Sequence, residues 1–517
     1  MKQSLAKVRS GAVTGVDAFP VEIEVDAGQG GDPVIVVVGL PDAAVRESRD
    51  RVAAAMVNAG FAPYSGRVTV NLAPADVRKE GPLFDLPIAV GILAAQGDIV
   101  PEPGMLESTA LVGELSLSGE VRRVRGVLPI ALEMRRQGLH RILVPPENAA
   151  EAAAVDGIDV FAVRTLRDAT DLLEGAGGAV PVPPPAEDLA ALVSADEPDF
   201  AEVRGQESAK RAVTVAVAGG HNLLMIGPPG SGKSMIARRI ASILPPMTLD
   251  EALDATKIHS IAGLLPADQP LLRQRPFRAP HHTVSDAGLL GGGSNPMPGE
   301  VSLAHHGVLF LDELPEFHRQ VLEVLRQPLE DGVVTITRAA ATCTFPCQMM
   351  LVAAMNPCPC GFHGDPKHQC RCSHVQIQNY RNKISGPLLD RIDLHIEVAA
   401  TRFQDLQSRR PGLTSAQMRE AVENARLVQR RRFADLPRIH SNARMGRREI
   451  ERFCRLDEAS ATLLRIAMEE LNFSARGHDR ILKVARTVAD LEGHENIAEE
   501  DIQEALQYRA LDRQFWF

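Results

Sequence analysis

The spacing of hydrophobic residues predicts an N-terminal region in which strands and helices alternate. The short apolar runs 33–39 and 67–74 are typical of buried strands, and the longer segments 41–60 and 84–97 carry apolar residues at helical spacing. We therefore expect residues 1–175 to form one α/β module.

A second α/β region follows a stretch that is rich in glycine and proline. Residues 175–189, GAGGAVPVPPPAEDL, have the composition of a linker, which we place at 176–198. Beyond it, residues 221–244 follow the order strand, glycine-rich loop and helix, and residues 306–314 form another apolar run that ends in acidic residues. This order is typical of a parallel sheet covered by helices, which we assign to residues 199–400.

The last part of the chain is predicted to be helical. Apolar residues recur at helical spacing in 415–432, 458–472 and 478–493. We expect a helical lid or bundle over residues 401–517. The predicted fold class is therefore α/β, with an α/β N-terminal module, a parallel-sheet core and a C-terminal α-helical lid.

The amino-acid composition is that of an ordinary globular protein. Its 517 residues are 45% hydrophobic, 4% aromatic and 24% charged, and a chain of this length is expected to contain roughly two to four domains. The start of the chain lacks the apolar core of a signal peptide, and the longest uncharged run, 212–232, contains glycines and prolines that do not suit a bilayer. We expect a cytoplasmic protein with no membrane partner.

Charge is distributed unevenly along the chain. The net charge of −10 argues against a protein that coats nucleic acid over its whole surface. Between Thr401 and Ile450, however, there are twelve arginines, no lysines and five acidic residues. This segment is either a solvated helical face with ion pairs between subunits or a surface that contacts nucleic-acid phosphates.

A phosphate-binding motif is the clearest chemical signal. Residues 227–234 match G-x-x-x-x-G-K-[ST] between a predicted strand and a predicted helix, which is the context that the motif requires. Lys233 would reach the β and γ phosphates, and Ser234 would supply a magnesium ligand. The predicted cofactors are therefore ATP and Mg²⁺. The loop consists of Gly227, Pro228, Pro229, Gly230, Ser231, Gly232, Lys233 and Ser234.

Polar residues follow two later strands. The run VLFLDE, residues 308–313, places Asp312 and Glu313 at the end of a buried strand. Asp312 is expected to hold the magnesium ion, usually through its water, and Glu313 to act as general base toward the attacking water. Asn356 ends the run LVAAMN and could orient the same water.

Four further segments are similar to blocks of the ComM/YifB family of magnesium-chelatase-like AAA+ ATPases. They are FRAPHHTVSDAGLLGGG (277–293), PGEVSLAHHGVLFLDELPEF (298–317), NPCPCG (356–361) and ISGPLLDRIDLHIEV (384–398). The resemblance extends over essentially the whole chain.

The resemblance implies roles for several of these residues in a homo-oligomeric ring, which we expect to be a hexamer. Asn356 resembles sensor 1, and Arg391 resembles the arginine finger that one subunit offers to the γ-phosphate of its neighbour. Arg476 is the expected sensor 2, and Arg480 is the less favoured choice.

The resemblance also implies two insertions and a DNA substrate. The insertions correspond to residues 260–295 and to a hairpin over 332–345. Insertions of this clade project toward the pore, so Arg275, Arg278 and Arg338 are the expected contacts to DNA phosphates. The alternative is that these arginines pair with acidic residues across subunit interfaces.

The N-terminal module resembles the proteolytic domain of Lon in residues 79–95 and 111–148. Lon-type proteolysis needs a serine nucleophile and a lysine base. Leu83 falls at the position of the serine and Leu128 at that of the lysine, so we expect a fold that serves assembly or binding and has no protease activity.

Four of the seven cysteines occur within fifteen residues. Cys358, Cys360, Cys370 and Cys372 form C-x-C-x(9)-C-x-C, which could close a tetrahedral structural zinc site. The C-x-C spacing is tighter than the usual C-x-x-C knuckle, so a histidine could replace one thiolate, and a metal-free loop remains an alternative. The histidines concerned are His363, His368 and His374.

The adjacent pairs His281–His282 and His305–His306 also have metal-like spacing. If each pair lies on a strand, its side chains point to opposite faces. We therefore favour hydrogen-bonding roles near the insertion and the strand 308–311. Cys454 stands alone and is expected to be a packing residue.

These features favour an ATP-hydrolysing ring that moves DNA, with helicase or branch-migration activity in recombination or natural transformation. The family resemblance supplies the DNA part of this prediction. The alternative is a magnesium-chelatase-like ATPase that remodels a protein partner. An ATP-dependent protease is a third interpretation, against which Leu83 and Leu128 argue.

Overall fold

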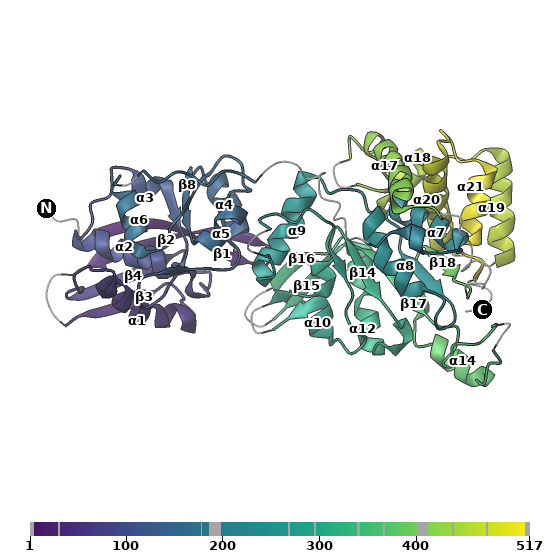
Figure 1. Ribbon diagram of the computed structural model, residues 1–517, viewed down its shortest axis with the longest axis horizontal. Helices are drawn as coiled ribbons and strands as arrows, with labels where there is room; N and C mark the ends of the chain where they lie inside the picture. Colours follow the sequence, from purple (N-terminus) through teal and green to yellow (C-terminus); the bar gives the residue numbers. More distant parts are fainter. Residues whose placement is uncertain are drawn as a thin grey trace. The chain divides into compact units, whose positions relative to one another are not determined.

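The computed structural model describes residues 5–28, 32–176, 178–185, 198–266, 269–293, 296–338, 342–365, 368–400, 412–436, 439–471 and 474–511. Most of the predicted linker, residues 401–411 of the arginine-rich segment and residues 339–341 of the predicted hairpin lie outside the described residues. The chain divides into two compact units, each drawn in Figure 1. The first comprises 1–188 with 249–272, and the second comprises 189–248 with 273–517.

The first unit is built on a mixed seven-stranded sheet in the order β3-β4-β2-β1-β5-β8-β9. Alternate residues of the long β1–β2 hairpin, such as Val8 and Ile23, are fully buried beneath α2 and α4, as the period of two along a strand requires. The strands are β1 (Leu5–Thr14), β2 (Asp17–Ala27), β3 (Val34–Val38), β4 (Arg67–Ala73), β5 (Thr109–Leu111), β8 (Arg141–Val144) and β9 (Asp159–Ala162), with a separate small pair of β6 (Glu114–Leu115) and β7 (Val121–Arg122).

The helices of the first unit include one that is distant in sequence. They are α1 (Ala43–Asn58), α2 (Asp85–Gln96), α3 (Met105–Ser108), α4 (Val127–Arg136), α5 (Pro146–Ala152), α6 (Leu166–Leu173) and α9 (Leu249–Ala262). Helix α9 packs against α4, and Ser260 Oγ donates a 2.8 Å hydrogen bond to the buried Glu151. Residues 249–272 thus belong to the first unit, although the sequence interpretation places them within the range 199–400.

Buried apolar side chains occupy the two positions that were compared with the catalytic dyad of Lon. Leu83 lies in a short 3-10 turn (Pro82–Phe84) with 8% exposure, and Leu128 lies at the start of α4 with none. Neither position carries a nucleophile or a base.

The second unit contains a parallel five-stranded sheet in the order β11-β14-β17-β10-β18. Every residue of β10, β14 and β17 is buried, as expected for strands covered on both faces. The strands are β10 (Leu223–Ile226), β11 (Phe277–Arg278), β14 (Val308–Leu311), β17 (Met350–Met355) and β18 (Leu394–Glu397). The α/β class with a parallel-sheet core is therefore confirmed.

The second unit also contains eight helices before residue 400 among the described residues, and two hairpins. The helices are α7 (Glu207–Gly219), α8 (Lys233–Arg239), α10 (Asp286–Leu290), α11 (Glu300–Leu303), α12 (Arg319–Val324), α13 (Arg326–Asp331), α14 (His374–Arg381) and α15 (Gly386–Leu389). The hairpins are β12 (Gly291–Gly292) with β13 (Met297–Pro298), and β15 (Val333–Thr337) with β16 (Thr342–Pro346).

The C-terminal part is helical, as predicted. Its long helices α17 and α20 pack on α7 and on each other. The helices are α17 (Ser415–Arg432), α18 (Arg447–Phe453), α19 (Glu458–Leu471), α20 (Ala475–Glu492) and α21 (Glu499–Gln507). Over the described part of the chain, no helix has both the length and the apolar composition that a bilayer crossing requires.

Candidate functional site

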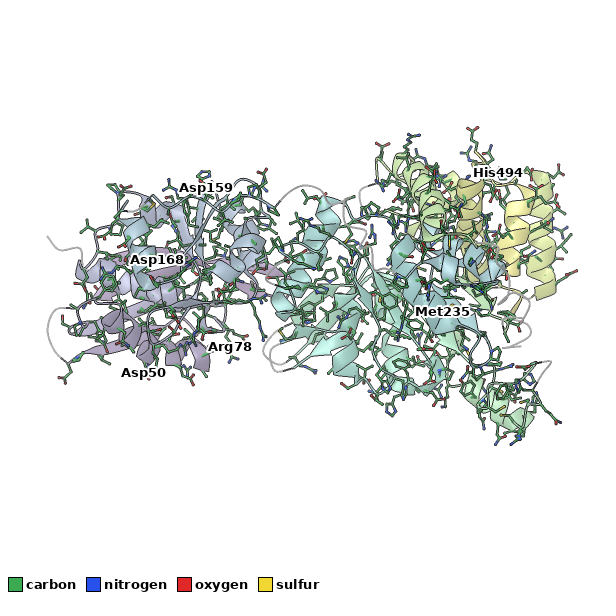
Figure 2. All side chains as sticks on the ribbon, in the orientation of Figure 1. Asp50, Arg78, Asp159, Asp168, Met235 and His494 are labelled. Atoms are coloured by element: carbon green, nitrogen blue, oxygen red, sulfur yellow. The ribbon has the colours of Figure 1, made fainter. Side chains whose placement is uncertain are left out.

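The glycine-rich loop connects the carboxyl end of β10 to the start of α8. Gly227 leaves the strand where a β-carbon would lie 2.2 Å from the carbonyl oxygen of Val398, so a side chain is excluded there. Gly232 has a φ of 94°, in the left-handed region that glycine adopts without strain. The next turn begins α8, and Met235 on it is labelled in Figure 2.

Polar groups of the loop fit a bound phosphate chain. Lys233 Nζ lies inside the loop and donates to the carbonyl oxygens of Gly227 at 2.7 Å and Pro228 at 2.9 Å. Burial lowers the pKa of this ammonium, while the nearby charges of Asp312 and Glu313 raise it. The buried Ser231 Oγ has no hydrogen-bond partner among the described residues. A donor-rich loop with an unpaired hydroxyl is suited to an anionic ligand such as the phosphates of ATP.

The acidic pair at the end of β14 lies beside this loop. Ser234 Oγ donates a 2.5 Å hydrogen bond to Asp312 Oδ2, so the hydroxyl and the carboxylate predicted to share a magnesium ion are adjacent. Glu313 has a left-handed φ of 52°, unusual for a residue with a side chain. Its side chain is 57% exposed, so its carboxylate is open to water.

Histidine contacts give Glu313 a partner that the sequence interpretation did not assign. His282 Nδ1 lies 3.6 Å from Glu313 Oε2. The expectation that paired histidines point apart is wrong, because neither pair lies on a strand: the ring centroids of His281 and His282 are 4.1 Å apart, and those of His305 and His306 are 3.9 Å apart.

Hydrogen-bonding roles nevertheless fit two of these histidines. His281 Nδ1 lies 2.9 Å from the hydroxyl of Thr283, and His305 Nδ1 accepts a 2.9 Å hydrogen bond from the backbone amide of Gln348.

Asn356 completes the group at this edge of the sheet. It follows β17, the strand between β14 and β10, and its Oδ1 accepts a 3.2 Å hydrogen bond from Lys233 Nζ. Because the carboxyl ends of parallel strands meet at one edge, three strands bring the loop, the acids and the amide together. The structure thus places Lys233, Ser234, Asp312, Glu313 and Asn356 in one site.

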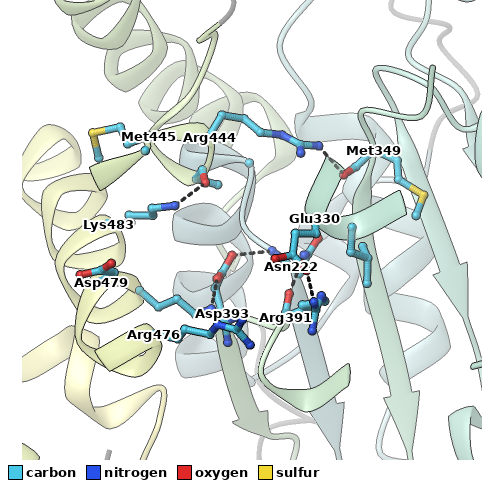
Figure 3. A pocket seen from close by; sticks show the side chains of 15 residues that line it. Asn222, Glu330, Met349, Arg391, Asp393, Arg444, Met445, Arg476, Asp479 and Lys483 are labelled. Atoms are coloured by element: carbon cyan, nitrogen blue, oxygen red, sulfur yellow. Dashed lines mark hydrogen bonds and ion pairs between the residues drawn. The ribbon is translucent and has the colours of Figure 1, made fainter. Parts of the chain in front are cut away.

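The arginines assigned to the finger and to sensor 2 lie elsewhere, around a cavity of about 420 Å³ (Figure 3). Its lining includes Asn222, Met349 and Asp393, which immediately precede β10, β17 and β18. These are the amino ends of the strands, so the cavity lies at the sheet edge opposite the glycine-rich loop. The cationic residues that line it are Arg391, Arg444, Arg476, Arg480 and Lys483.

Arg391 is held by residues on either side of it. Its guanidinium pairs with Glu330 and donates a 2.7 Å hydrogen bond to the carbonyl oxygen of Pro387, while its side chain is only 12% exposed. Asn222 Nδ2 donates to the backbone carbonyl of Arg391 at 2.7 Å and thereby fixes its position beside β10. No sequence pattern singles out Asn222 or Glu330 for these contacts.

The two candidates for sensor 2 differ in their surroundings. Arg476, in the first turn of α20, is exposed. Arg480 lies deeper, with its Nε 3.6 Å from Asp393 Oδ1, and burial lowers its pKa. Burial alone would raise the pKa of the Asp393 carboxyl, but His221, Arg480 and Lys483 together hold it below its ordinary value. Arg480 is therefore paired with a buried acid, whereas Arg476 is open to solvent.

Two of the arginines predicted to bind DNA are held within the second unit. Arg275 donates to the carbonyl oxygens of Pro245 and His306, both at 2.7 Å. Arg278 makes hydrogen bonds of 2.6 and 2.7 Å with the two carboxylate oxygens of Glu300. A paired guanidinium is a poorer phosphate ligand than a solvated one, because the existing contacts must first be broken.

Arg338 has different surroundings. It follows β15 at the start of the hairpin tip, and its side chain is exposed. One face of the hairpin is buried, and the other presents hydroxyl groups to solvent. The exposed threonines are Thr335, Thr337, Thr342 and Thr344.

Part of the arginine-rich segment serves internal packing. Arg432 pairs with the buried Asp490, which also accepts a 2.8 Å hydrogen bond from Asn442. Arg426 donates 2.9 and 3.1 Å hydrogen bonds to backbone carbonyls. Arg430 and Arg431, at the end of α17, are exposed. The positive charge of this segment is thus partly structural.

The four clustered cysteines come together in space. Sγ of Cys358 lies 3.4 Å from that of Cys360 and 3.7 Å from that of Cys370, and all four sulfur atoms lie within 4.8 Å of one another. His363, His368 and His374 do not belong to this group. Cys454 is buried in the core of the second unit, as a packing residue would be.

Comparisons with known proteins match nearly the whole chain. Models of the magnesium chelatase subunit ChlI match residues 21–148 and 199–406, and a model of the C-terminal part of that subunit matches residues 412–509. The competence protein ComM of Haemophilus influenzae is 44% identical over 99% of this chain and 98% of its own length, and the YifB protein of Salmonella typhimurium is 44% identical over the same shares. Lon protease 2 of Bacillus subtilis is 29% identical over 113 residues, 22% of this chain and 20% of its own.

Proposed function

The chain belongs to the ComM/YifB magnesium-chelatase-like family, and from this premise we propose that it is an ATP-hydrolysing AAA+ motor that forms a hexameric ring and moves DNA. Its activity would be that of a helicase or branch-migration enzyme in recombination or natural transformation, in the cytoplasm. The Haemophilus relative is named a competence protein, and this name favours natural transformation.

The observation that carries the ATPase proposal is the meeting of three strand ends at one site. Lys233 bonds to Asn356 at 3.2 Å, and Ser234 bonds to Asp312 at 2.5 Å. Lys233 would neutralise phosphate charge, and Ser234 with Asp312 would hold Mg²⁺, which supplies charge stabilisation in phosphoryl transfer when bound. Glu313 would accept the proton of the attacking water, and Asn356 would orient that water.

The ring proposal is supported by the separation of the two functional edges. Arg391 and Arg476 line a cavity at the amino ends of the strands, whereas Lys233 lies at their carboxyl ends. One subunit cannot readily bring both edges to the same phosphate. In a head-to-tail ring, the arginine edge of one subunit faces the nucleotide edge of the next, so these arginines would act in trans.

The DNA proposal is supported by the β15–β16 hairpin. Its exposed face offers threonine hydroxyls next to the exposed Arg338, and such groups contact the nucleic-acid backbone without reading sequence. A net charge of −10 means that binding must rely on local basic surfaces of this kind. We rank Arg338 above Arg275 and Arg278, whose guanidinium groups have partners within the unit.

Charge reversal at the hairpin tests the DNA proposal. Arg338→Glu should leave ring assembly and DNA-free ATP hydrolysis unchanged but abolish DNA stimulation and movement of branched DNA, because a carboxylate repels phosphates. In the wild type, DNA affinity should fall as salt rises. Strand displacement on forked DNA, DNA-stimulated hydrolysis and ring mass are the measurements.

A matched control separates this effect from a general change in charge. Arg465 lies on α19 with a 63% exposed side chain, and Arg465→Glu should behave as the wild type in every assay. If Arg338→Glu binds and unwinds DNA normally, or if its rings dissociate, the proposal that Arg338 contacts DNA is overturned.

A further inference from the structure

The sulfur atoms of the cysteine cluster have the spacing of a tetrahedral metal site. Zinc binds thiolates at about 2.3 Å, which places the sulfurs of a tetrahedron about 3.8 Å apart. Three of the sulfur–sulfur separations are 3.4 Å for Cys358–Cys360, 3.7 Å for Cys358–Cys370 and 3.6 Å for Cys360–Cys370. Cys372 joins them within 4.8 Å. These separations are too long for disulfides, whose sulfurs lie about 2.0 Å apart.

Backbone amides point at the same sulfur atoms. The amides of Phe362 and Arg371 donate to the sulfur of Cys360, and the amide of His363 donates to the sulfur of Cys358. These hydrogen bonds fix the two sulfur atoms relative to the backbone of the turn that carries them.

The turn that carries Cys358 and Cys360 touches the glycine-rich loop that follows β10. A β-carbon placed on Gly361 would lie 2.5 Å from Cδ and 2.6 Å from Cγ of Pro229, so the turn and the loop are in direct contact. The contact is made by backbone that the cluster holds, since Gly361 follows Cys360 and its amide donates a 2.9 Å hydrogen bond to the carbonyl oxygen of Cys358.

The same turn directly follows Asn356, which belongs to the candidate ATP site. Asn356 lies two residues before Cys358, and the intervening Pro357 carbonyl accepts a 3.2 Å hydrogen bond from Arg381 of α14. The position of this segment therefore depends on where the cysteines are fixed.

We propose that Cys358, Cys360, Cys370 and Cys372 bind one Zn²⁺ ion per chain, and that this zinc site positions the ATP-binding loop through the contact between Gly361 and Pro229. The four thiols release their protons to solvent on binding, and no electron transfer is involved. The ion takes no part in hydrolysis. The cysteines are ligands, and Gly361 is a positioning residue for Pro229.

The first test concerns the metal alone. Elemental analysis of the full-length chain, purified under reducing conditions without chelator, should give about one zinc per chain, whereas Cys370→Ser and Cys372→Ser should lose it. Cys454→Ser, at a buried cysteine outside the cluster, should keep it. Wild-type protein with no stoichiometric metal would overturn the site, and stoichiometric iron would overturn the choice of zinc.

The second test concerns the link to the nucleotide loop and does not depend on the cysteine variants folding. Gly361→Ala should keep one zinc per chain but bind a fluorescent ATP analogue at least about tenfold more weakly, because its methyl group displaces Pro229. Gly364→Ala is a matched control, since Gly364 has a φ of 85° against 84° for Gly361 and no atom within 4 Å of its β-carbon.

The outcomes of this pair are distinct. Weak binding by Gly361→Ala together with normal binding by Gly364→Ala supports positioning. Equal affinity in Gly361→Ala and the wild type, or equal weakening in both variants, would overturn it, because the contact with Pro229 is then irrelevant. Neither result depends on DNA, so the proposed DNA activity stands or falls separately.

Discussion

Glu313→Gln should bind ATP with nearly normal affinity and hydrolyse it about 10²–10⁴-fold more slowly than the wild type, which is the usual cost of losing a general base. The substitution keeps the size of the side chain and removes its negative charge together with its ability to accept a proton. Glu313 is well placed for that role because it lies next to Asp312 and is open to water. Steady-state hydrolysis and equilibrium binding of an ATP analogue measure the two effects.

Lys233→Ala should instead lose ATP binding. Lys233 Nζ is the cation inside the loop, bonded to Gly227, Pro228 and Asn356, and no other lysine or arginine belongs to the motif.

The control for Glu313→Gln is a second acid-to-amide change, Glu316→Gln. Glu316 is exposed, lies three residues beyond Glu313 and pairs at 3.6 Å with Lys383. Near-normal turnover by Glu313→Gln, or a loss in Glu316→Gln of the same size, would remove Glu313 from the catalytic role.

Arg391→Ala should reduce ATP hydrolysis by about 10³-fold, the scale on which arginine fingers act, and it should do so without loss of ATP binding. The reason is geometric: Arg391 lies at the amino-terminal edge of the sheet, away from the loop of its own subunit. The exposed Arg447, with an 88% exposed side chain on α18, provides the control variant Arg447→Ala.

Mixing of inactive subunits tests whether this action is in trans. A ring that contains both Arg391→Ala and Lys233→Ala subunits has interfaces that pair an intact loop with an intact finger, so activity should reappear on mixing. Recovery should depend on the mixing ratio and peak when both subunits are present. Mixed rings that stay inactive at every ratio would contradict an arginine finger supplied by the neighbour.

The parts of the site that depend on short stretches of chain could be predicted from the sequence. A glycine-rich loop between β10 and α8 and an acidic pair after β14 are short-range patterns, because hydrophobic periodicity and glycine placement determine them within about ten residues. The β15–β16 hairpin and the helices α17, α19 and α20 were predictable for the same reason.

Contacts made by tertiary packing were not predictable. Asn222 joins the starts of β10 and β18 through its bonds to Arg391 and Asp393, yet no pattern distinguishes it from any asparagine before a strand. The placement of residues 249–272 in the first unit depends on the packing of α9 against α4. The histidine pairs were misjudged because the sequence alone did not show that they lie outside strands.

The central claim is that ATP hydrolysis by this chain is coupled to DNA. Its most direct test is the hydrolysis rate of the wild-type protein measured alone and with single-stranded, double-stranded and forked DNA, at low and at higher salt. We predict a faster rate in the presence of DNA and a loss of that stimulation as salt rises, because the contacts are to phosphates. A hydrolysis rate that no DNA changes at any salt concentration would contradict the claim and favour a motor that remodels a protein partner.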